Sequence, residues 1–111
     1  MYKIDFKNPL HIYFMGIGGI SMSGLAEILL NEGFTVSGSD IKETELTTAL
    51  AEKGAAIFYG QRAENLDERP NVPKIDLVVY TAAIKNDNPE FIAMQKKNIK
   101  SITRADLLGK S

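Results

Sequence analysis

A glycine-rich run directly follows an apolar segment near the start of the chain. The apolar segment is His11–Met15, and the run reads Gly16-Ile17-Gly18-Gly19-Ile20-Ser21-Met22-Ser23-Gly24. Beyond it, apolar side chains recur at the three- and four-residue spacing of a helix as far as residue 32. A strand, a glycine turn and a helix in this order predict an α/β unit whose helix begins where the strand ends.

Such a turn is suited to bind an anion. The first backbone N–H groups of a helix have no partners within the helix, and the helix dipole is positive at that end. Glycine has no Cβ, so a phosphate can approach the backbone closely. The sequence therefore predicts a nucleotide or nucleotide-sugar pocket. The alternative is a tight turn that needs glycine for packing alone.

Two known phosphate-binding patterns help to define the turn. The match to the dinucleotide pattern Gly-x-Gly-x-x-Gly is incomplete, because Ser21 occupies its third glycine position. A Walker A loop is excluded, because no Gly-Lys-Ser/Thr sequence follows and no lysine could reach a β- or γ-phosphate.

The rest of the chain alternates strands and helices in the same way. We expect further strands at 34–38, 56–59, 75–81 and 99–103, and helices at 44–53, at 89–97 and from Arg104 onward. A loop should span 60–74, with a short helical turn at 63–66. Five strands separated in this way imply parallel pairing with right-handed crossovers. The predicted fold is α/β, a Rossmann-like doubly wound parallel five-stranded sheet with helices on both faces.

Several helix ends carry typical boundary residues. Gly33 and Gly54 are placed to end the first two helices, and Asn98 to close the third. Asn88 is expected to cap the start of the third helix, with Pro89 at its first position.

In a doubly wound sheet, ligands bind beyond the carboxyl ends of the strands. Three segments should meet there, namely residues 16–23, Ser39-Asp40 and residues 81–88. An acidic residue about 20 positions past a glycine turn often binds ribose hydroxyls, which is one interpretation of Asp40. An N-cap for the following helix is the other, since Asp also favours that position.

Composition and charge exclude several classes of function for this chain. The chain has 111 residues, 44% apolar and 24% charged, as expected for one globular domain. Its net charge of −1 argues against a general nucleic-acid surface. With no cysteine, disulfides, thiolate metal sites and a cysteine nucleophile are excluded. The apolar stretch 10–30 is interrupted by glycines and Glu27, which argues against a membrane span.

No set of catalytic side chains can be assembled from the sequence. The single histidine, His11, begins the first expected strand, far from the glycine turn, so a structural role is expected. The acids Glu64, Asp67 and Glu68 are expected to be solvated loop charges. Arg104 stands at a helix start, where its charge opposes the dipole, so it is expected to meet an acid or an anion. The sequence describes a binding domain better than a complete enzyme.

Five blocks of the sequence resemble the Mur ligase family in order and spacing. They are residues 11–26, Val36-Ser37-Gly38-Ser39-Asp40, Val78-Val79-Tyr80-Thr81-Ala82-Ala83-Ile84, Asp87-Asn88-Pro89-Glu90 and Arg104-Ala105-Asp106-Leu107-Leu108. The branch that adds L-alanine to UDP-N-acetylmuramate fits best. The tripeptide-recycling branch typically carries a cysteine in the glycine loop, and the D-glutamate-adding branch usually lacks the double glycine. Three positions depart from the usual pattern, since Gln61 and Tyr13 stand where histidines are common and Ser21 where glycine is common.

The resemblance implies that residues 1–111 form the UDP-sugar-binding N-terminal domain of a cytoplasmic ligase of peptidoglycan synthesis, which serves cell-wall biogenesis, cell shape and cell division. The central ATPase domain and the C-terminal domain are not in this chain. The whole enzyme would use ATP and Mg²⁺ to phosphorylate the lactyl carboxylate of UDP-N-acetylmuramate, and L-alanine would attack the acyl phosphate. This domain alone would have no ligase activity, and no cofactor, metal, nucleic acid or membrane is expected to bind it.

The same resemblance assigns the contacts to the UDP moiety. The diphosphate is expected to bind the backbone of the glycine turn, with the Ser23 hydroxyl as a further donor; this set is Gly16, Gly18, Gly19, Ile20, Ser21, Met22 and Ser23. The uridine is expected to contact Asp40 and the loop residues Thr81, Ala82 and Ala83.

Other functions are kept as alternatives. A regulatory domain that binds NAD(H) through Asp40 is the first of them, although Ser21 in the glycine pattern argues against it. An adenylating domain would also use a Gly-x-Gly-Gly turn, but it would usually need an Asn-Leu-x-Arg-Gln-like segment, which the sequence lacks. A pure interaction module is the last alternative.

Overall fold

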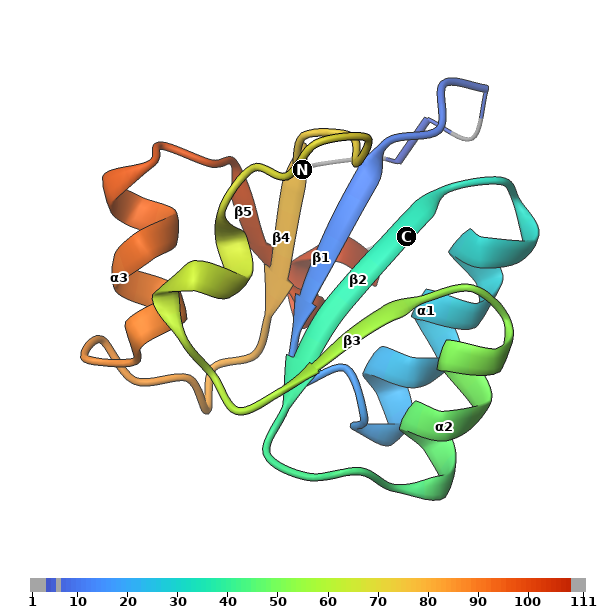
Figure 1. Cartoon of the computed structure of the whole chain (residues 1–111), viewed down its shortest axis with the longest axis horizontal. Coiled ribbons are helices and arrows are strands. Elements are labelled where there is room, and N and C mark those ends of the chain that lie inside the picture. Colours follow the sequence, from blue (N-terminus) through green and yellow to red (C-terminus); the bar gives the residue numbers. More distant parts are fainter. Residues whose placement is uncertain (1–3, 6, 109–111) are drawn as a thin grey trace.

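Five parallel strands form the middle layer of the structure (Figure 1). The computed structural model describes residues 4, 5 and 7–108, and the other residues of the expected domain 1–111 lie outside the described part. The strands are β1 (His11–Met15), β2 (Thr35–Asp40), β3 (Ala56–Tyr59), β4 (Leu77–Tyr80) and β5 (Ser101–Thr103). Their order across the sheet, β3-β2-β1-β4-β5, confirms the predicted doubly wound topology.

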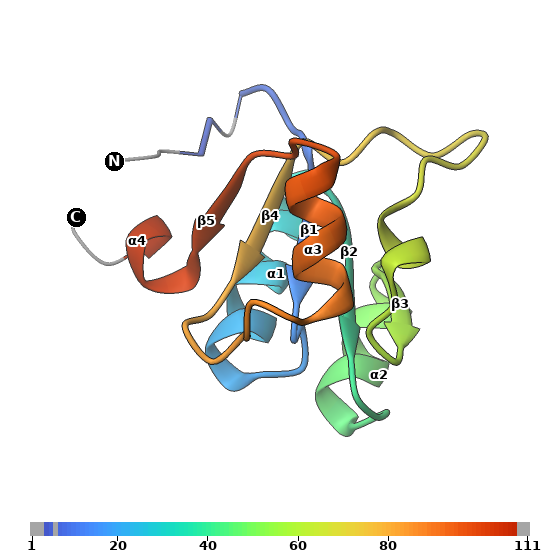
Figure 2. The ribbon, with the colours of Figure 1, turned by 90° about the vertical axis from the view of Figure 1, so that its left-hand side faces the viewer.

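Helices cover both faces of this sheet. They are α1 (Ile20–Asn31), α2 (Glu45–Glu52), α3 (Pro89–Lys96) and α4 (Arg104–Leu108), and a 3-10 turn, η1, spans Ala63–Leu66. Figures 1 and 2 show α1 and α2 on one face and α3 and η1 on the other. Leu107 of α4 packs into the core on the α1 face. The helices therefore lie on both faces, as predicted.

Alternate side chains of β1 contribute to two separate cores. Ile12 and Phe14 pack into the core that includes Leu29 of α1. Tyr13 and Met15 pack into the core that includes Met94 of α3. All five residues of β1 are buried, which is typical of the central strand of a parallel sheet.

The helix boundaries fall close to the predicted positions, because local capping interactions set them. Asn88 caps α3, since its side-chain oxygen accepts from the backbone N–H groups of Glu90 and Phe91, and Pro89 takes the first helical position. The end of α2 is followed by Gly54, whose φ of 112° few other residues adopt. The prediction of 44–53 for α2 included its two capping residues, Thr44 and Lys53.

Three strands differ in their bounds from the prediction. β4 begins at Leu77 instead of residue 75. Just before it, the Asp76 N–H donates to the His11 carbonyl and the Asp76 carboxylate accepts from the His11 N–H, both at 2.8 Å. β5 is shorter than predicted, beginning at Ser101 rather than residue 99. β2 extends to Asp40 instead of residue 38, because its last residues pair with β3.

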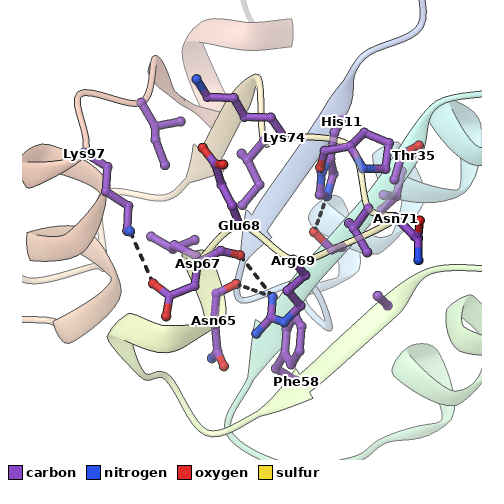
Figure 3. A pocket seen from close by; sticks show the side chains of 18 of the residues that line it. His11, Thr35, Phe58, Asn65, Asp67, Glu68, Arg69, Asn71, Lys74 and Lys97 are labelled. Carbon is purple, nitrogen blue, oxygen red and sulfur yellow. Dashed lines mark hydrogen bonds and ion pairs between the residues drawn. The ribbon is translucent and has the colours of Figure 1, made fainter.

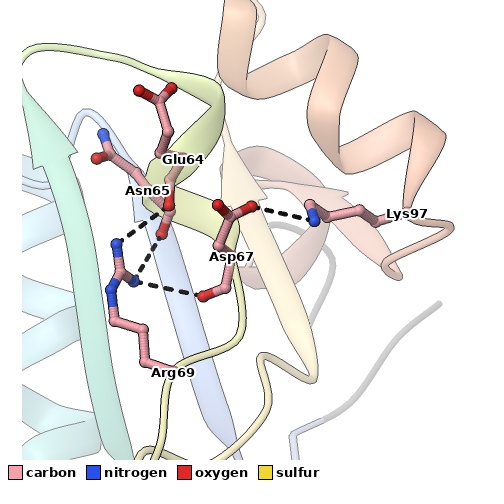
Figure 4. A network of polar contacts seen from close by, with 5 residues as sticks. All are labelled: Glu64, Asn65, Asp67, Arg69 and Lys97. Atoms are coloured by element: carbon pink, nitrogen blue, oxygen red, sulfur yellow. Dashed lines mark hydrogen bonds and ion pairs between the residues drawn. The ribbon is translucent and has the colours of Figure 1, made fainter.

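The connection from β3 to β4 contains η1 in place of a full crossover helix. Arg69 holds this segment, because its guanidinium donates to the carbonyl oxygens of Glu64, Asn65 and Asp67 (Figure 4). The same guanidinium lies 4.7 Å from the centre of the Phe58 ring. Lys97, just after α3, forms an ion pair with Asp67 at 3.2 Å. The helical turn expected at 63–66 is confirmed.

Candidate functional site

The glycine turn joins β1 to α1 through a short network of backbone hydrogen bonds. The N–H groups of Gly16 and Ile17 both donate to the carbonyl oxygen of Ser39, at 2.9 Å each. Gly16 has a φ of 86°, a conformation that favours glycine. The turn is therefore fastened to the last residues of β2.

The first turn of α1 has no side-chain cap. Gly19 is the N-cap residue, and the first bond of the helix runs from the Ser23 N–H to the Gly19 carbonyl at 2.7 Å. The N–H groups of Ile20, Ser21 and Met22 precede that bond and have no acceptor within the helix. The helix thus presents uncapped donors at the positive end of its dipole.

Asp40 closes the turn from the β2 side. Its carboxylate accepts from the Gly18 N–H at 2.8 Å and from the Ile41 N–H at 2.7 Å. The interpretation of Asp40 as the N-cap of α2 is wrong, because Thr44 holds that position and forms a reciprocal capping box with Thr47. The predicted helix 44–53 had placed Thr44 inside the helix and not at its cap.

Two glycines near the turn are required by internal packing. A Cβ on Gly18 would lie 2.7 Å from the Asp40 carboxylate oxygen and 3.0 Å from Thr47 Cγ2. A Cβ on Gly38 would lie 2.5 Å from the carbonyl oxygen of Phe14. Gly19 differs, because a Cβ there would make only ordinary contacts, the nearest at 3.5 Å. Packing therefore explains the glycine at 18 but not the one at 19.

A cavity of about 460 Å³ opens beside this turn, at the carboxyl ends of the strands. It is lined by Gly16, Asp40, Ile41, Gln61, Ala83, Ile84, Lys85, Asp87, Asn88 and Pro89. The loops after β1, β2 and β4 meet here, as the topology predicts. The loop after β3 joins them through Gln61, whose side-chain oxygen accepts from Asn88 Nδ2 at 2.7 Å.

The predicted site residues divide into two groups. Gly16, Asp40 and Ala83 line the cavity, whereas Gly18, Gly19, Ile20, Ser21, Met22, Ser23, Thr81 and Ala82 are not among its lining residues. Ser23 is buried, and its hydroxyl donates to the Ile20 carbonyl at 3.1 Å. The Gly18 N–H is bonded to Asp40, so in this structure it faces a carboxylate.

Sequence reasoning missed most of the lining residues, including Lys85 and Asp87. The only signal for them was their place in the loop after the fourth strand. Their charges matter, because the lining carries one cation, Lys85, and two acids, Asp40 and Asp87. An anionic ligand therefore has to be held mainly by backbone N–H groups, since the charged side chains alone do not attract it.

A second cavity, of about 540 Å³, lies on the opposite end of the sheet, next to the first residues of β1 and β2 (Figure 3). His11 lines it and is buried, and its two ring nitrogens lie 2.7 Å from the Pro73 carbonyl oxygen and 2.7 Å from Ser37 Oγ. Both nitrogens are thus engaged, so the expected structural role of His11 is confirmed.

The Arg104 guanidinium donates to the Ser21 carbonyl at 3.4 Å, and Arg104 forms no ion pair with an acid within the described residues.

Residues 4, 5 and 7–108 contain neither a cluster of metal-ligating side chains nor a helix that could span a membrane. No group of three or more His, Asp or Glu side chains could hold a metal ion there. No helix in the same residues has the length and apolar character needed to cross a bilayer.

Comparisons with known proteins identify a family that the chain matches. The model of a family described as "Mur ligase family, catalytic domain" matches residues 11–111. The UDP-N-acetylmuramate–L-alanine ligase of Agathobacter rectalis is 62% identical over 109 residues, which make up 98% of this chain and 23% of that protein. The crystal structure of UDP-N-acetylmuramate-alanine ligase from Thermotoga maritima aligns with a TM-score of 0.77 and 37% identity, covering 87% of this chain and 21% of that one.

A relative whose name describes a different ligase shares the same fold. The UDP-N-acetylmuramate:L-alanyl-gamma-D-glutamyl-meso-diaminopimelate ligase from Neisseria meningitides aligns with a TM-score of 0.76 and 33% identity, over 87% of this chain and 29% of that one. The chain spans less than a third of each of these relatives. With a family match that covers nearly all of its length, the chain belongs to the Mur ligase family.

Proposed function

We propose that this chain is the UDP-sugar-binding N-terminal domain of a UDP-N-acetylmuramate–L-alanine ligase of peptidoglycan synthesis. Similarity to proteins of that name along 98% of the chain supports the assignment. The observation that carries it is the uncapped start of α1 beside a cavity at the carboxyl ends of the strands. A diphosphate needs such donors, because the lining side chains have no excess positive charge.

In this proposal, the diphosphate binds the first turn of α1. The N–H groups of Ile20, Ser21 and Met22 donate to its oxygens, and the helix dipole favours its charge. Gly19 allows the close approach, since no contact inside the protein requires glycine there. Gly16 lines the cavity, and Gly18 acts indirectly, because its N–H positions Asp40. Lys85 supplies the nearby cation from the loop after β4.

The uridine then occupies the 460 Å³ cavity. Asp40 and Ile41 form one side of it, and the segment Thr81, Ala82 and Ala83 leads into the other, with Ala83 in the lining. Ser23 supports the turn through its bond to the Ile20 carbonyl, inside the first turn of the helix.

The complete reaction needs parts of the protein beyond this chain. ATP and Mg²⁺ would supply phosphorylation of the substrate carboxylate, and L-alanine would attack the acyl phosphate, outside the part of the longer relatives that this chain matches. We assign residues 1–111 to substrate docking in the cytoplasm, with no ligase activity of their own.

The test is calorimetric titration of the chain with UDP-N-acetylmuramate, with NADH and ATP as parallel ligands. Saturable binding of the UDP-sugar alone supports the proposal. Binding of NADH alone would replace it with the redox-regulatory alternative, and binding of none of the three would refute it for this chain.

Two glycine variants on the same helix sharpen this test. Gly19→Ala should keep the fold and weaken UDP-sugar binding by about tenfold or more, because a methyl group would displace the diphosphate from charge-assisted hydrogen bonds. Gly24→Ala is the matched control, since a Cβ there meets nothing within 4 Å. Equal affinity in the two variants would contradict the placement of the diphosphate.

A further inference from the structure

A buried carboxylate with no cationic partner among the described residues lies between α3 and the sheet. Glu90, in the first turn of α3, is 0% exposed. Its oxygens accept hydrogen bonds at 2.7 Å from Tyr13 Oη, Ser39 Oγ and Asn65 Nδ2. The ion pairs of the described residues join other side chains, Lys53 with Glu27 and Lys97 with Asp67. Three neutral donors therefore hold this buried acid.

Packing alone does not explain a carboxylate at this buried position. Removing a charge from water costs free energy, and an apolar side chain of similar volume usually serves a core at least as well. What the carboxylate offers is acceptor capacity, because its two oxygens accept from several donors at once and donate to none. Burial and the Glu90 charge raise the pKa of the Tyr13 phenol, so this donor keeps its proton.

Two of the three donors, Ser39 and Asn65, connect Glu90 to segments of the candidate site. Ser39 is the junction with the glycine turn, since its hydroxyl donates to Glu90 while its carbonyl accepts from Gly16 and Ile17. The next residue is Asp40, whose carboxylate holds Gly18. The path from Glu90 to the glycine turn therefore passes through a single residue.

A second path leads to the loop after β3. Asn65 Nδ2 donates to Glu90 and also to the Gly60 carbonyl at 2.9 Å. The following residue, Gln61, accepts from Asn88 Nδ2, and Asn88 in turn accepts from the Glu90 N–H. These contacts close a ring that returns to Glu90.

We propose that Glu90 is a positioning residue for the nucleotide site: its buried carboxylate fixes the glycine turn, the end of β2, the loop after β3 and the start of α3 relative to one another. The inference rests on the proposed UDP-sugar function. Glu90 itself does not line the 460 Å³ cavity and acts through Ser39 and Asn65. Its loss disturbs binding by misplacing donors that contact the ligand.

The chain offers a matched pair of substitutions. Ser39 and Ser37 are both buried on the same face of β2, and each forms a hydrogen bond with a different buried side chain. Ser39 bonds to Glu90, and Ser37 bonds to His11. Ser39→Ala removes a donor to Glu90, whereas Ser37→Ala removes the contact with His11 at the other end of the sheet. Ser39→Ala should weaken UDP-N-acetylmuramate binding by about tenfold, the size of one hydrogen bond to a charged group, and Ser37→Ala should leave it unchanged.

A second readout needs no ligand. In the unliganded chain, hydrogen exchange at the Gly16 and Ile17 amides should become about tenfold faster in Ser39→Ala, because their acceptor is less firmly held. Ser37→Ala should leave these rates unchanged. Thermal unfolding of both variants shows whether a general loss of stability accounts for any difference.

Two substitutions at Glu90 complete the test. Glu90→Gln keeps an acceptor toward Tyr13 and Asn65 and can donate to Ser39, so it should hold binding within about threefold of the unaltered chain. Glu90→Leu leaves all three donors unpaired and should lose binding by about tenfold or more. If Glu90→Leu does not fold, the comparison of Ser39→Ala with Ser37→Ala still tests the positioning role of Glu90.

The outcomes separate the two proposals. Failure of the unaltered chain to bind the UDP-sugar overturns the proposed function, and the exchange rates then still test the role of Glu90. Equal exchange rates and equal affinities in Ser39→Ala and Ser37→Ala would overturn the positioning role while the proposed function stands.

Discussion

Gly18 provides a stringent test of how the glycine turn is held. A Cβ at this position would lie 2.7 Å from the Asp40 carboxylate oxygen that accepts the Gly18 N–H. Either the carboxylate moves away and the bond is lost, or the turn shifts toward solvent. Thr47, whose Cγ2 would lie at 3.0 Å, limits the room for adjustment, because it is fully buried.

The magnitude of Gly18→Ala follows from two opposing effects. Losing a hydrogen bond to a charged group costs about 1.5–3 kcal/mol. Alanine recovers about 0.4–1 kcal/mol by restricting the unfolded chain, because Gly18 has no positive φ that would strain it. The net loss of folding free energy is about 1–2 kcal/mol, which corresponds to a fall in Tm of about 5–15 °C for a domain of this size.

Urea and thermal denaturation of Gly18→Ala, followed by circular dichroism, would measure this loss. The same substitution in an Asp40→Ala background should cost at least about 1 kcal/mol less, because the crowded carboxylate is absent. An unchanged cost in that background would show that Thr47, and not Asp40, opposes the Cβ. An unaltered Tm in Gly18→Ala would refute the reasoning altogether.

Further predictions concern other parts of the molecule. Leu29→Ala, in a fully buried position of α1, should lower the free energy of unfolding by about 2–5 kcal/mol in urea titrations, and a loss below about 1 kcal/mol would contradict the packing described for this core. Because the pKa of Tyr13 is raised on folding, its contribution to stability is complete below about pH 10, the unfolded value, and is lost as pH rises beyond it. Tyr13→Phe should remove that alkaline decline in urea midpoints, and an identical decline in both proteins would count against it. Lys53→Met should change stability by less than about 0.5 kcal/mol, since its 2.7 Å ion pair with Glu27 is about half exposed, and a larger loss in the same titrations would show a hidden role.

The fold could be predicted from the sequence because its determinants are local. The alternation of apolar segments, the cap at Asn88 and the glycine at 54 each act within a few residues of the chain. Strand lengths were less predictable, since the Asp76 carboxylate accepts from the His11 N–H just ahead of β4, and no local pattern reveals that contact.

The site could be predicted only in part, because contacts between distant segments define it. The topology indicated which loops meet, but not that the Asp40 carboxylate would face the Gly18 N–H. Gln61 and Lys85 drew no attention as lining residues, since neither belongs to a phosphate-binding pattern. In the sequence, Glu90 was named only as part of the block Asp87-Asn88-Pro89-Glu90. Glutamate is rarely buried, so its place at the centre of a polar network came from the structure alone.

The strand order has a consequence for how this chain folds. β1 pairs with β2, its near neighbour in sequence, but also with β4, and the contact between His11 and Asp76 spans 65 positions. Closing the longer loop costs more conformational entropy, so the unit from β1 to β3 should assemble before β4 joins it. Glu90 follows β4, whereas Tyr13 and Ser39 belong to the early unit. Substitutions in the Glu90 network should therefore speed unfolding more than they slow folding. The network would form late in folding and act mainly by slowing unfolding.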